Sequence, residues 1–284
     1  MKLLIFLFPY CALGFVAQSP SCRPYARPCA PVHSVQAAKA PTIEEWKGWS
    51  DADVDTFMRN YWQRKPLLIR QAFPGCSNGG TPLVSKEELL NLACAEDVES
   101  RIIQGFVAPP GGEARWQLSS GPFEEADFSR VFFGKVPWTL LVNEVNRHVP
   151  EASDLLQRFA FLPSWRIDDL MVSYAPRGGG VGPHVDSYDV FLLQVAGTRQ
   201  WSIETQAIST EAEVERLVPG IDVRILKGFQ EDHTWTLNPG DMLYLPPRVP
   251  HHGVSLDDEC ITYSVGFRAP SHREVGCLMG PILG

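Results

Sequence analysis

After Ile167 the sequence consists mainly of short β-type runs, and each run is bounded by Gly or Pro. The runs are Met171–Tyr174, Val190–Val195, Arg199–Ile203, Met242–Leu245 and Ile261–Phe267. Closely spaced strands with turn signals between them are typical of an antiparallel barrel or a double-stranded β-helix. We therefore expect residues 167–284 to form a jelly-roll core of this kind.

Residues 42–166 have a mixed pattern, which predicts a helical and β region ahead of the barrel. Helices are expected over Val54–Tyr61, Lys86–Cys94 and Glu151–Phe161, and strands over Pro66–Arg70, Arg101–Phe106 and Trp116–Leu118. A Thr cap followed by two carboxylates indicates a further helix start at Thr42–Trp46. The fold class is thus mainly β, with N-terminal α/β elements.

We interpret the first forty-one residues as a targeting leader. Leu3–Val16 is almost entirely apolar, but it is shorter than the roughly 20 residues that a membrane-spanning helix needs. A small-x-small site at Ala12–Gly14 allows cleavage before Phe15, and Gln18–Pro41 is basic and free of acidic residues. This organisation resembles the bipartite leaders of plastids of secondary origin; a mitochondrial presequence or a secretory signal is the alternative. No membrane association is expected after leader removal.

Composition limits the classes of partner. Hydrophobic residues make up 44% and charged residues 20% of the 284 residues, which excludes wholesale disorder. The net charge of −8 argues against direct nucleic-acid binding, since a phosphate backbone requires a basic surface, and it suits a basic protein partner. The seven cysteines form no CxxC pair, so the sequence supports neither a disulfide scaffold nor a zinc finger.

The segment Gly178–Asp186, with the sequence GGGVGPHVD, carries the residues from which we infer a metal site. His184 and Asp186 are two residues apart, so their side chains leave the same face of an extended strand. A third ligand is expected from His251 or His252, which follow a strand and a proline turn. Adjacent strand residues point to opposite faces, so only one of this pair should face the metal.

Two imidazoles and one carboxylate on one face of an octahedral metal leave three coordination positions open. This arrangement suits non-haem Fe(II) that binds a chelating 2-oxo acid and O₂, whereas a structural zinc closes its coordination with four protein ligands. The other histidines lack partners at ligand spacing and are expected on the surface or in loops: His33, His148, His233 and His272.

The distal carboxylate of an oxo acid needs a cation. Arg199 lies 15 residues after His184, on the next expected strand. Its guanidinium can clasp a carboxylate through two parallel hydrogen bonds. The alternative is an ordinary surface arginine.

Four motifs make the chain resemble the bacterial ribosomal oxygenases, which are cupin-like JmjC arginine hydroxylases that use Fe(II) and 2-oxoglutarate. The motifs are DDLMVS from Asp168, GGGVGPHVDSYDVFLLQVAGTRQW from Gly178, GDMLYLPPRVPHHG from Gly240 and TYSVGFRAP from Thr262. The resemblance covers residues 42–273 and implies a jelly-roll barrel behind an N-terminal helical region. It implies iron on His184, Asp186 and His251, because the family's distal histidine directly follows the proline, and 2-oxoglutarate on Arg199.

The resemblance also implies a substrate, namely an arginine side chain of a large-subunit ribosomal protein. In the family an acidic residue holds the guanidinium, and a Met and a Tyr sandwich it. The matching positions, with two further polar contacts, are Asp169, Met171, Ser173, Tyr188 and Ser264. A carboxylate pairs bidentately with a guanidinium, and an aromatic face attracts a cation. Roles in a turn or in core packing are the alternative.

Other functions are compatible with the same motifs. A JmjC histidine hydroxylase or lysine demethylase shares the iron site, and Asp169 favours arginine over histidine because a guanidinium needs a counterion. A non-catalytic cupin that serves as a binding module in ribosome assembly belongs to a different class. The family's helical dimerisation and winged-helix domains follow the barrel, and we expect both to be absent here, which leaves the oligomeric state open.

Overall fold

The computed structural model of the chain describes residues 43–77, 82–106, 115–220 and 224–268. The predicted leader, residues 1–41, and residues 269–284 lie outside this part of the chain. The described residues belong to one compact unit. No helix within these ranges has the length and apolar character that crossing a bilayer requires.

The described ranges contain both strands and helices. The strands are β1 (Glu45–Lys47), β2 (Leu67–Arg70), β3 (Ser100–Phe106), β4 (Arg115–Ser120), β5 (Trp138–Val142), β6 (Ile167–Ala175), β7 (Asp189–Ala196), β8 (Arg199–Ile203), β9 (His233–Leu237), β10 (Met242–Leu245), β11 (His251–Ser255) and β12 (Cys260–Phe267). The α-helices are α1 (Asp51–Asn60), α2 (Pro74–Ser77), α3 (Lys86–Leu92), α4 (Glu125–Phe132), α5 (Pro150–Gln157) and α6 (Thr210–Arg216). Two short 3₁₀ helices are η1 (Val145–Arg147) and η2 (Ser164–Arg166).

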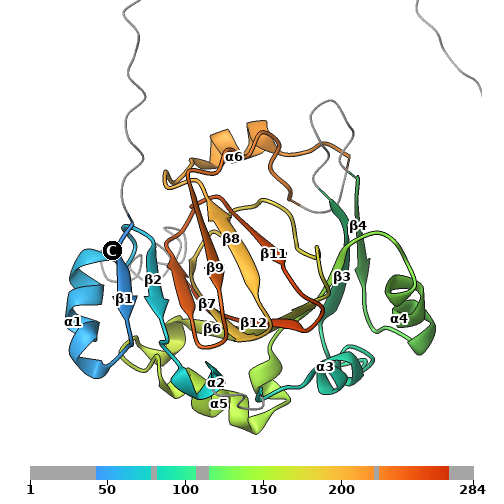
Figure 1. Cartoon of the computed structure of the whole chain (residues 1–284), viewed down its shortest axis with the longest axis horizontal. Helices are drawn as coiled ribbons and strands as arrows, with labels where there is room; N and C mark the ends of the chain where they lie inside the picture. The colour runs from blue at the N-terminus through green and yellow to red at the C-terminus, as the bar shows by residue number, and fades with distance from the viewer. Residues whose placement is uncertain (1–42, 78–81, 107–114, 221–223, 269–284) are drawn as a thin grey trace, which may run out of the picture. The chain divides into compact units, whose positions relative to one another are not determined.

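The strands form two sheets (Figure 1). The large sheet has the order β1-β2-β10-β7-β12-β6-β5-β3-β4, and the small sheet has the order β11-β8-β9. Only β1 and β2 pair in parallel among these strands. In Figure 1 the small sheet crosses in front of β6, β7 and β12. This arrangement confirms the predicted double-stranded β-helix, and β6 begins at the expected boundary, Ile167.

Side chains along the central strands alternate between an apolar core on one face of the sheet and a cavity on the other. On β12, Tyr263 packs in a core rich in aromatic rings with residues of α1, α4 and α5, whereas Thr262 and Ser264 line a cavity on the other face. Leu192 of β7 also lies on that inner face and joins Trp201 of β8 in a second apolar cluster. Because side chains alternate with a period of two, one strand supplies both the core and the cavity.

Several local signals in the N-terminal part are confirmed, including α1, α3, α5, β2, β3 and β4. Helix α3 begins after Ser85, whose hydroxyl accepts a hydrogen bond from the Glu88 amide while the Glu88 carboxylate accepts one from the Ser85 amide. This pair is the predicted capping box, which stabilises a helix start by about 1 kcal/mol. The strands of residues 42–166 extend the same sheet as β6, so this region is built into the barrel.

The helix start expected at Thr42–Trp46 is wrong. Residues Glu45–Lys47 form β1, which pairs with β2, and the first helix begins only at Asp51. Trp46 packs edge-on against Tyr61, with ring centroids 5.1 Å apart, and stacks on Trp49 at 6.3 Å. These aromatic contacts and the strand pairing outweigh a local cap signal, which is worth only about 1 kcal/mol.

Candidate active site

A cavity of about 280 Å³ is lined by residues from both sheets. Every residue that the sequence singled out for a site lines this cavity: Asp169, Met171, Ser173, His184, Asp186, Tyr188, Arg199, His251 and Ser264. They come from β6, the loop before β7, β8, β11 and β12. The structure therefore brings all of them together, and the individual roles assigned to them stay predictions.

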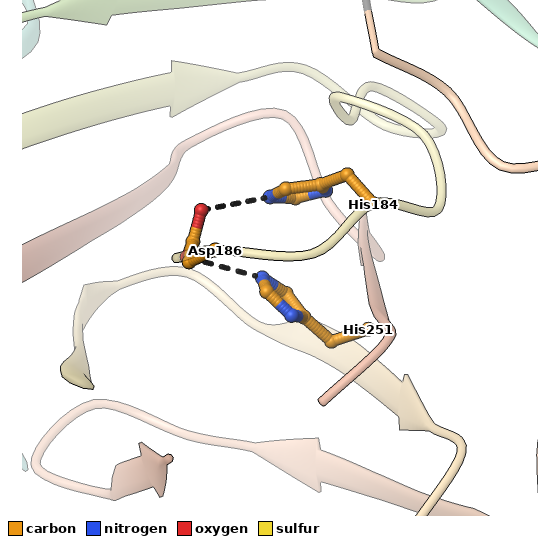
Figure 2. Close-up of side chains that lie close together, drawn as sticks. All are labelled: His184, Asp186 and His251. Carbon is orange, nitrogen blue, oxygen red and sulfur yellow. Dashed lines mark ion pairs between the residues drawn. The ribbon is translucent and has the colours of Figure 1, made fainter. Parts of the chain in front are cut away.

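Three of these residues form a compact cluster that can hold a metal ion. His184, Asp186 and His251 offer one ligand atom each, and these atoms all lie within 4.8 Å of one another. The Nε2 atoms of His184 and His251 lie 3.9 Å and 3.5 Å from oxygens of the Asp186 carboxylate. Figure 2 shows the three side chains turned toward one another. Two imidazoles and one carboxylate are a donor set typical of non-haem Fe(II).

The extended strand expected for His184 and Asp186 is wrong. His184 forms an isolated bridge with His251, and residues 185–188 lie outside any strand. Backbone hydrogen bonds nevertheless join the two ligand segments: the amides of His184 and His251 donate to each other's carbonyls at 3.0 Å and 2.9 Å, and the Arg248 amide donates to Asp186 at 2.8 Å. The loop is therefore held by its partner segment rather than by a strand of its own.

The second ring nitrogen of each histidine fixes the tautomer. His184 Nδ1 lies 2.8 Å from the Gly182 carbonyl, and His251 Nδ1 lies 2.9 Å from the Val249 carbonyl. A carbonyl oxygen only accepts hydrogen bonds, so each Nδ1 carries the proton in this arrangement. Each Nε2 then has the free lone pair that a metal ligand needs, and the ring orientation is set before any metal binds.

The glycines before His184 allow the ligand segment to lie close to its neighbours. A Cβ atom on Gly180 would lie 2.2 Å from the carbonyl oxygen of Gly253. Gly182 has φ +89°, and a Cβ atom there would lie 2.7 Å from the ring of Trp116. Both distances are too short for any side chain, so glycine is required at these two positions.

A Gly182→Ala substitution should weaken metal binding, because it displaces the carbonyl that orients His184. We expect at least a tenfold loss of metal affinity, similar to the loss of an outer-shell partner. Isothermal titration with Co(II) or Fe(II) measures this effect. Gly48→Ala is the matched control, because Gly48 has φ +78° but no atom within 4 Å of the added Cβ. Equal metal affinity in the two variants would contradict the steric argument.

Burial distinguishes the two candidate histidines. His251 is 2% exposed and belongs to the metal cluster, while His252, the next residue on β11, is half-buried and lies near the Phe229 ring. Burial, with repulsion from His184, lowers the pKa of His251 to about 4. The same two causes lower the pKa of His252 to about 4. Without a metal, both rings are therefore neutral at physiological pH, which is the form that ligates metals.

The lowered pKa of His251 predicts how the stability of the metal-free protein depends on pH. In the unfolded chain the His251 imidazole takes up a proton near pH 6.5, whereas in the folded protein the same ring takes it up only near pH 4. The free energy of unfolding should therefore fall as the pH drops from 6.5 to 4, by on the order of 3 kcal/mol for this group. Chemical denaturation of the metal-free chain and of His251→Gln measures the difference. Parallel pH profiles for the two proteins would contradict this expectation.

Arg199 is a buried cation whose guanidinium is only partly satisfied. The residue is 2% exposed, its Nε donates to the Cys260 sulfur at 3.3 Å, and its Nη2 has no hydrogen-bond partner. Gln194 of β7 donates to the same sulfur at 3.4 Å and accepts from the Thr262 hydroxyl at 2.9 Å. Among the described residues, no Asp or Glu forms an ion pair with Arg199.

Sequence reasoning missed Cys260, which contacts Arg199, and Gln194, which contacts Cys260. Gln194 is fully buried in the middle of the apolar run FLLQVA, and Cys260 begins the last strand. A buried polar side chain in a central strand needs a hydrogen-bond partner, so Gln194 was a detectable signal. The contact with Cys260 joins residues 66 positions apart and requires the tertiary structure.

Asp169, which lines the same cavity, carries the charge opposite to that of Arg199. The Asp169 carboxylate accepts a hydrogen bond from the Glu144 amide at 2.9 Å, and no ion pair to it is formed within the described ranges. Burial raises the pKa of Asp169, and the neighbouring carboxylates of Asp168, Glu144 and Glu99 raise it further. Tyr188, also on the cavity wall, is 37% exposed. A cationic ligand would relieve this repulsion.

The residues present fit both a metal ion and a small dicarboxylic acid. The cluster of His184, Asp186 and His251 supplies an N₂O donor set with oriented Nε2 atoms. The buried Nη2 of Arg199 lacks a partner, and an unsatisfied buried donor is rare in native proteins. An anionic carboxylate is the partner that this guanidinium requires.

Comparisons with known proteins give the same family as the motifs. The JmjC domain family matches residues 154–275. The chain is 39% identical over 220 residues to the ribosomal protein uL16 3-hydroxylase of Escherichia coli, covering 77% of this chain and 53% of that protein. It is 38% identical to a probable ribosomal oxygenase of Haemophilus influenzae, covering 76% of this chain and 50% of that protein.

A solved structure supports the relationship. The E. coli ribosomal oxygenase YcfD in complex with cobalt and 2-oxoglutarate is similar with a TM-score of 0.64 at 35% identity, covering 81% of this chain and 55% of that one. The chain thus spans about half the length of the relatives it matches. With the matched domain and these similarities together, the chain is a JmjC-domain protein that is similar to ribosomal oxygenases.

Proposed function

We propose that this protein is an Fe(II)- and 2-oxoglutarate-dependent oxygenase that hydroxylates an arginine side chain of a large-subunit ribosomal protein. The relatives named as a uL16 hydroxylase and as ribosomal oxygenases support this reaction class. The observation that carries the proposal is a metal-ligand cluster in a cavity whose lining includes a buried guanidinium and a carboxylate that form no ion pair within the described ranges. Arg199 lacks an anion, and Asp169 lacks a cation, among the described residues. Glu99 and Arg101 also line this cavity without an ion pair in the described part of the chain.

The charges of Arg199 and Asp169 match the two organic reactants. Arg199 would hold the distal carboxylate of 2-oxoglutarate, since a guanidinium forms two parallel hydrogen bonds with a carboxylate. Asp169 would hold the guanidinium of the substrate by the same geometry, with Met171 and Tyr188 against its faces and Ser173 and Ser264 as polar contacts. Each side chain would gain an oppositely charged partner from its ligand, so the two ligands would occupy different parts of the cavity.

His184, Asp186 and His251 would hold the ferrous ion through their Nε2 and carboxylate oxygen atoms. With 2-oxoglutarate and O₂ it supplies the oxidation, in which one oxygen atom enters a substrate C–H bond, the other enters succinate, and CO₂ is released. The protein's contribution is position. Three side chains fix the metal, Arg199 fixes the cosubstrate, and Asp169 fixes the side chain to be hydroxylated.

Mass spectrometry tests the proposed reaction. Purified protein is incubated with Fe(II), 2-oxoglutarate, O₂ and peptides of large-subunit ribosomal proteins that contain arginine, histidine or lysine. The expected result is one added oxygen on an arginine residue, with succinate formed in equal amount. Addition to a histidine residue or demethylation of a lysine would replace the arginine assignment. No oxygen addition to any peptide, with binding retained, would favour a non-catalytic binding module.

The leader predicted over residues 1–41 supports a proposal about the compartment in which the protein acts. A basic stretch without acidic residues follows an apolar segment at the start of the chain. We propose delivery to a plastid, and a plastid ribosomal protein is then the expected substrate. A fluorescent fusion of residues 1–41 tests the destination, and a secreted or mitochondrial signal from that fusion would contradict it.

A further inference from the structure

Among the described residues, Trp201 is one of three on the cavity wall, with Arg101 and Arg199, that have a buried donor without a hydrogen-bond partner. The residue is 5% exposed, lines the same cavity as Arg199, and its indole Nε1 has no hydrogen-bond partner. Arg199 and Trp201 are two residues apart on β8, so their side chains leave the same face of the strand. Two unsatisfied donors on one face of one strand are unusual, because each costs stability when no acceptor is present.

The contacts of Trp201 place it close to Arg199 and to His251. The Arg199 guanidinium carbon lies 5.7 Å from the centroid of the Trp201 ring. The centroid of the Trp201 ring also lies 5.8 Å from that of the His251 ring. The indole therefore lies next to both His251, the proposed metal ligand, and Arg199, the proposed partner of the carboxylate.

The indole ring is also held in a fixed orientation. Trp201 is opposite Gly253 in the β8–β11 register, and a Cβ atom on Gly253 would lie 2.7 Å from the indole ring. A side chain at position 253 would therefore displace the ring. Glycine at this position lets the indole ring pack closely against β11, which limits the ring's freedom to reorient its N–H toward another acceptor.

We propose that the Trp201 indole N–H is a second donor to the distal carboxylate of 2-oxoglutarate, beside Arg199. This inference rests on the proposed function and adds a binding residue to it. A carboxylate has about four lone-pair sites, so it can accept from a guanidinium and from an indole at the same time. Bound cosubstrate would then satisfy both of the unpaired donors on β8.

A pair of tryptophan variants separates this role from simple packing. Trp201→Phe retains an aromatic ring and removes the N–H. Trp235→Phe is the matched control, because Trp235 is the cross-strand partner of Trp201, lies in the same apolar cluster and does not line the cavity. Fe(II)-loaded protein is titrated without oxygen by calorimetry, first with 2-oxoglutarate and then with 2-oxobutanoate, which lacks the distal carboxylate.

We expect Trp201→Phe to weaken 2-oxoglutarate binding about tenfold and to leave 2-oxobutanoate binding unchanged, which is the effect of losing one hydrogen bond to a charged group. The readout is the ratio of the two affinities, because partial misfolding lowers the active fraction equally for both ligands. A ratio equal to that of Trp235→Phe would overturn the inference. If the unsubstituted protein failed to bind 2-oxoglutarate, the proposed function itself would fall.

A measurement on the unsubstituted protein covers the case in which Trp201→Phe does not fold. The protein is labelled with ¹⁵N-tryptophan and loaded with Zn(II), and its indole N–H resonances are followed by NMR. One resonance should shift on addition of 2-oxoglutarate and stay in place with 2-oxobutanoate. An identical response to the two acids would contradict a bond from the indole to the distal carboxylate.

Discussion

Replacing Asp186 with Ala should abolish 2-oxoglutarate turnover and leave the fold intact. The carboxylate lies within 3.9 Å of both histidine Nε2 atoms, and it is the anionic member of the ligand cluster. Loss of an outer-shell partner already lowers metal affinity about 10- to 100-fold, so loss of a ligand should exceed that range. The contact that holds the loop survives, because the Arg248 amide donates to the backbone carbonyl of Asp186.

Succinate formation and metal titration measure the effect of Asp186→Ala, and thermal unfolding of the metal-free protein checks the fold. Asp232→Asn is a matched control, because Asp232 also lies beside a histidine, with His233 Nδ1 at 3.3 Å, but does not line the cavity. The control should retain metal binding and turnover. Full activity in Asp186→Ala would refute the ligand assignment, and every role built on that cluster would be withdrawn.

Replacing Arg199 with Met should change stability and cosubstrate binding in opposite directions. The guanidinium is buried without a carboxylate among the described residues, so removing its charge should raise the free energy of unfolding of the ligand-free protein, by about 1–4 kcal/mol. The same change removes charge-assisted hydrogen bonds to the cosubstrate, which should weaken 2-oxoglutarate binding about 100-fold.

Chemical denaturation and calorimetric titration test the two halves of this prediction separately. Arg224→Met is the matched control, because Arg224 is an exposed arginine that pairs with the buried Glu213 and lies outside the cavity. Cosubstrate affinity should be unchanged in that control. A ligand-free Arg199→Met protein that is markedly less stable would indicate a structural arginine instead. Unchanged 2-oxoglutarate affinity would exclude Arg199 as the clasp.

The barrel was predictable because its strands carry a local signal. β8 and β10 coincide with the expected runs, and β6, β7 and β12 extend beyond them by a few residues. Other elements, namely α4, β5, α6, β9 and β11, were not predicted. β11 carries His251 and begins directly after a proline turn, and its sequence HHGVS lacks a run of strand-forming residues. Its register comes from pairing with β8, which is a contact between distant segments.

The candidate site was predictable in membership but not in geometry. Spacing placed His184 and Asp186 together, and the proline turn placed a histidine far along the chain beside them. The extended strand assumed for the first pair does not exist, because the loop is held by backbone hydrogen bonds to His251 and Arg248. Such bonds have no sequence signature, since every residue except proline carries the same backbone groups.

By itself the sequence determined the residue types of the site and the period-two faces of its strands. The tertiary structure decided which histidine of the pair faces the carboxylate, which side chains hold Arg199, and that two donors on β8 lack acceptors. The physical reason is that side-chain chemistry and alternation are local properties. Burial, pairing and unsatisfied polar groups instead depend on contacts between segments far apart in the chain.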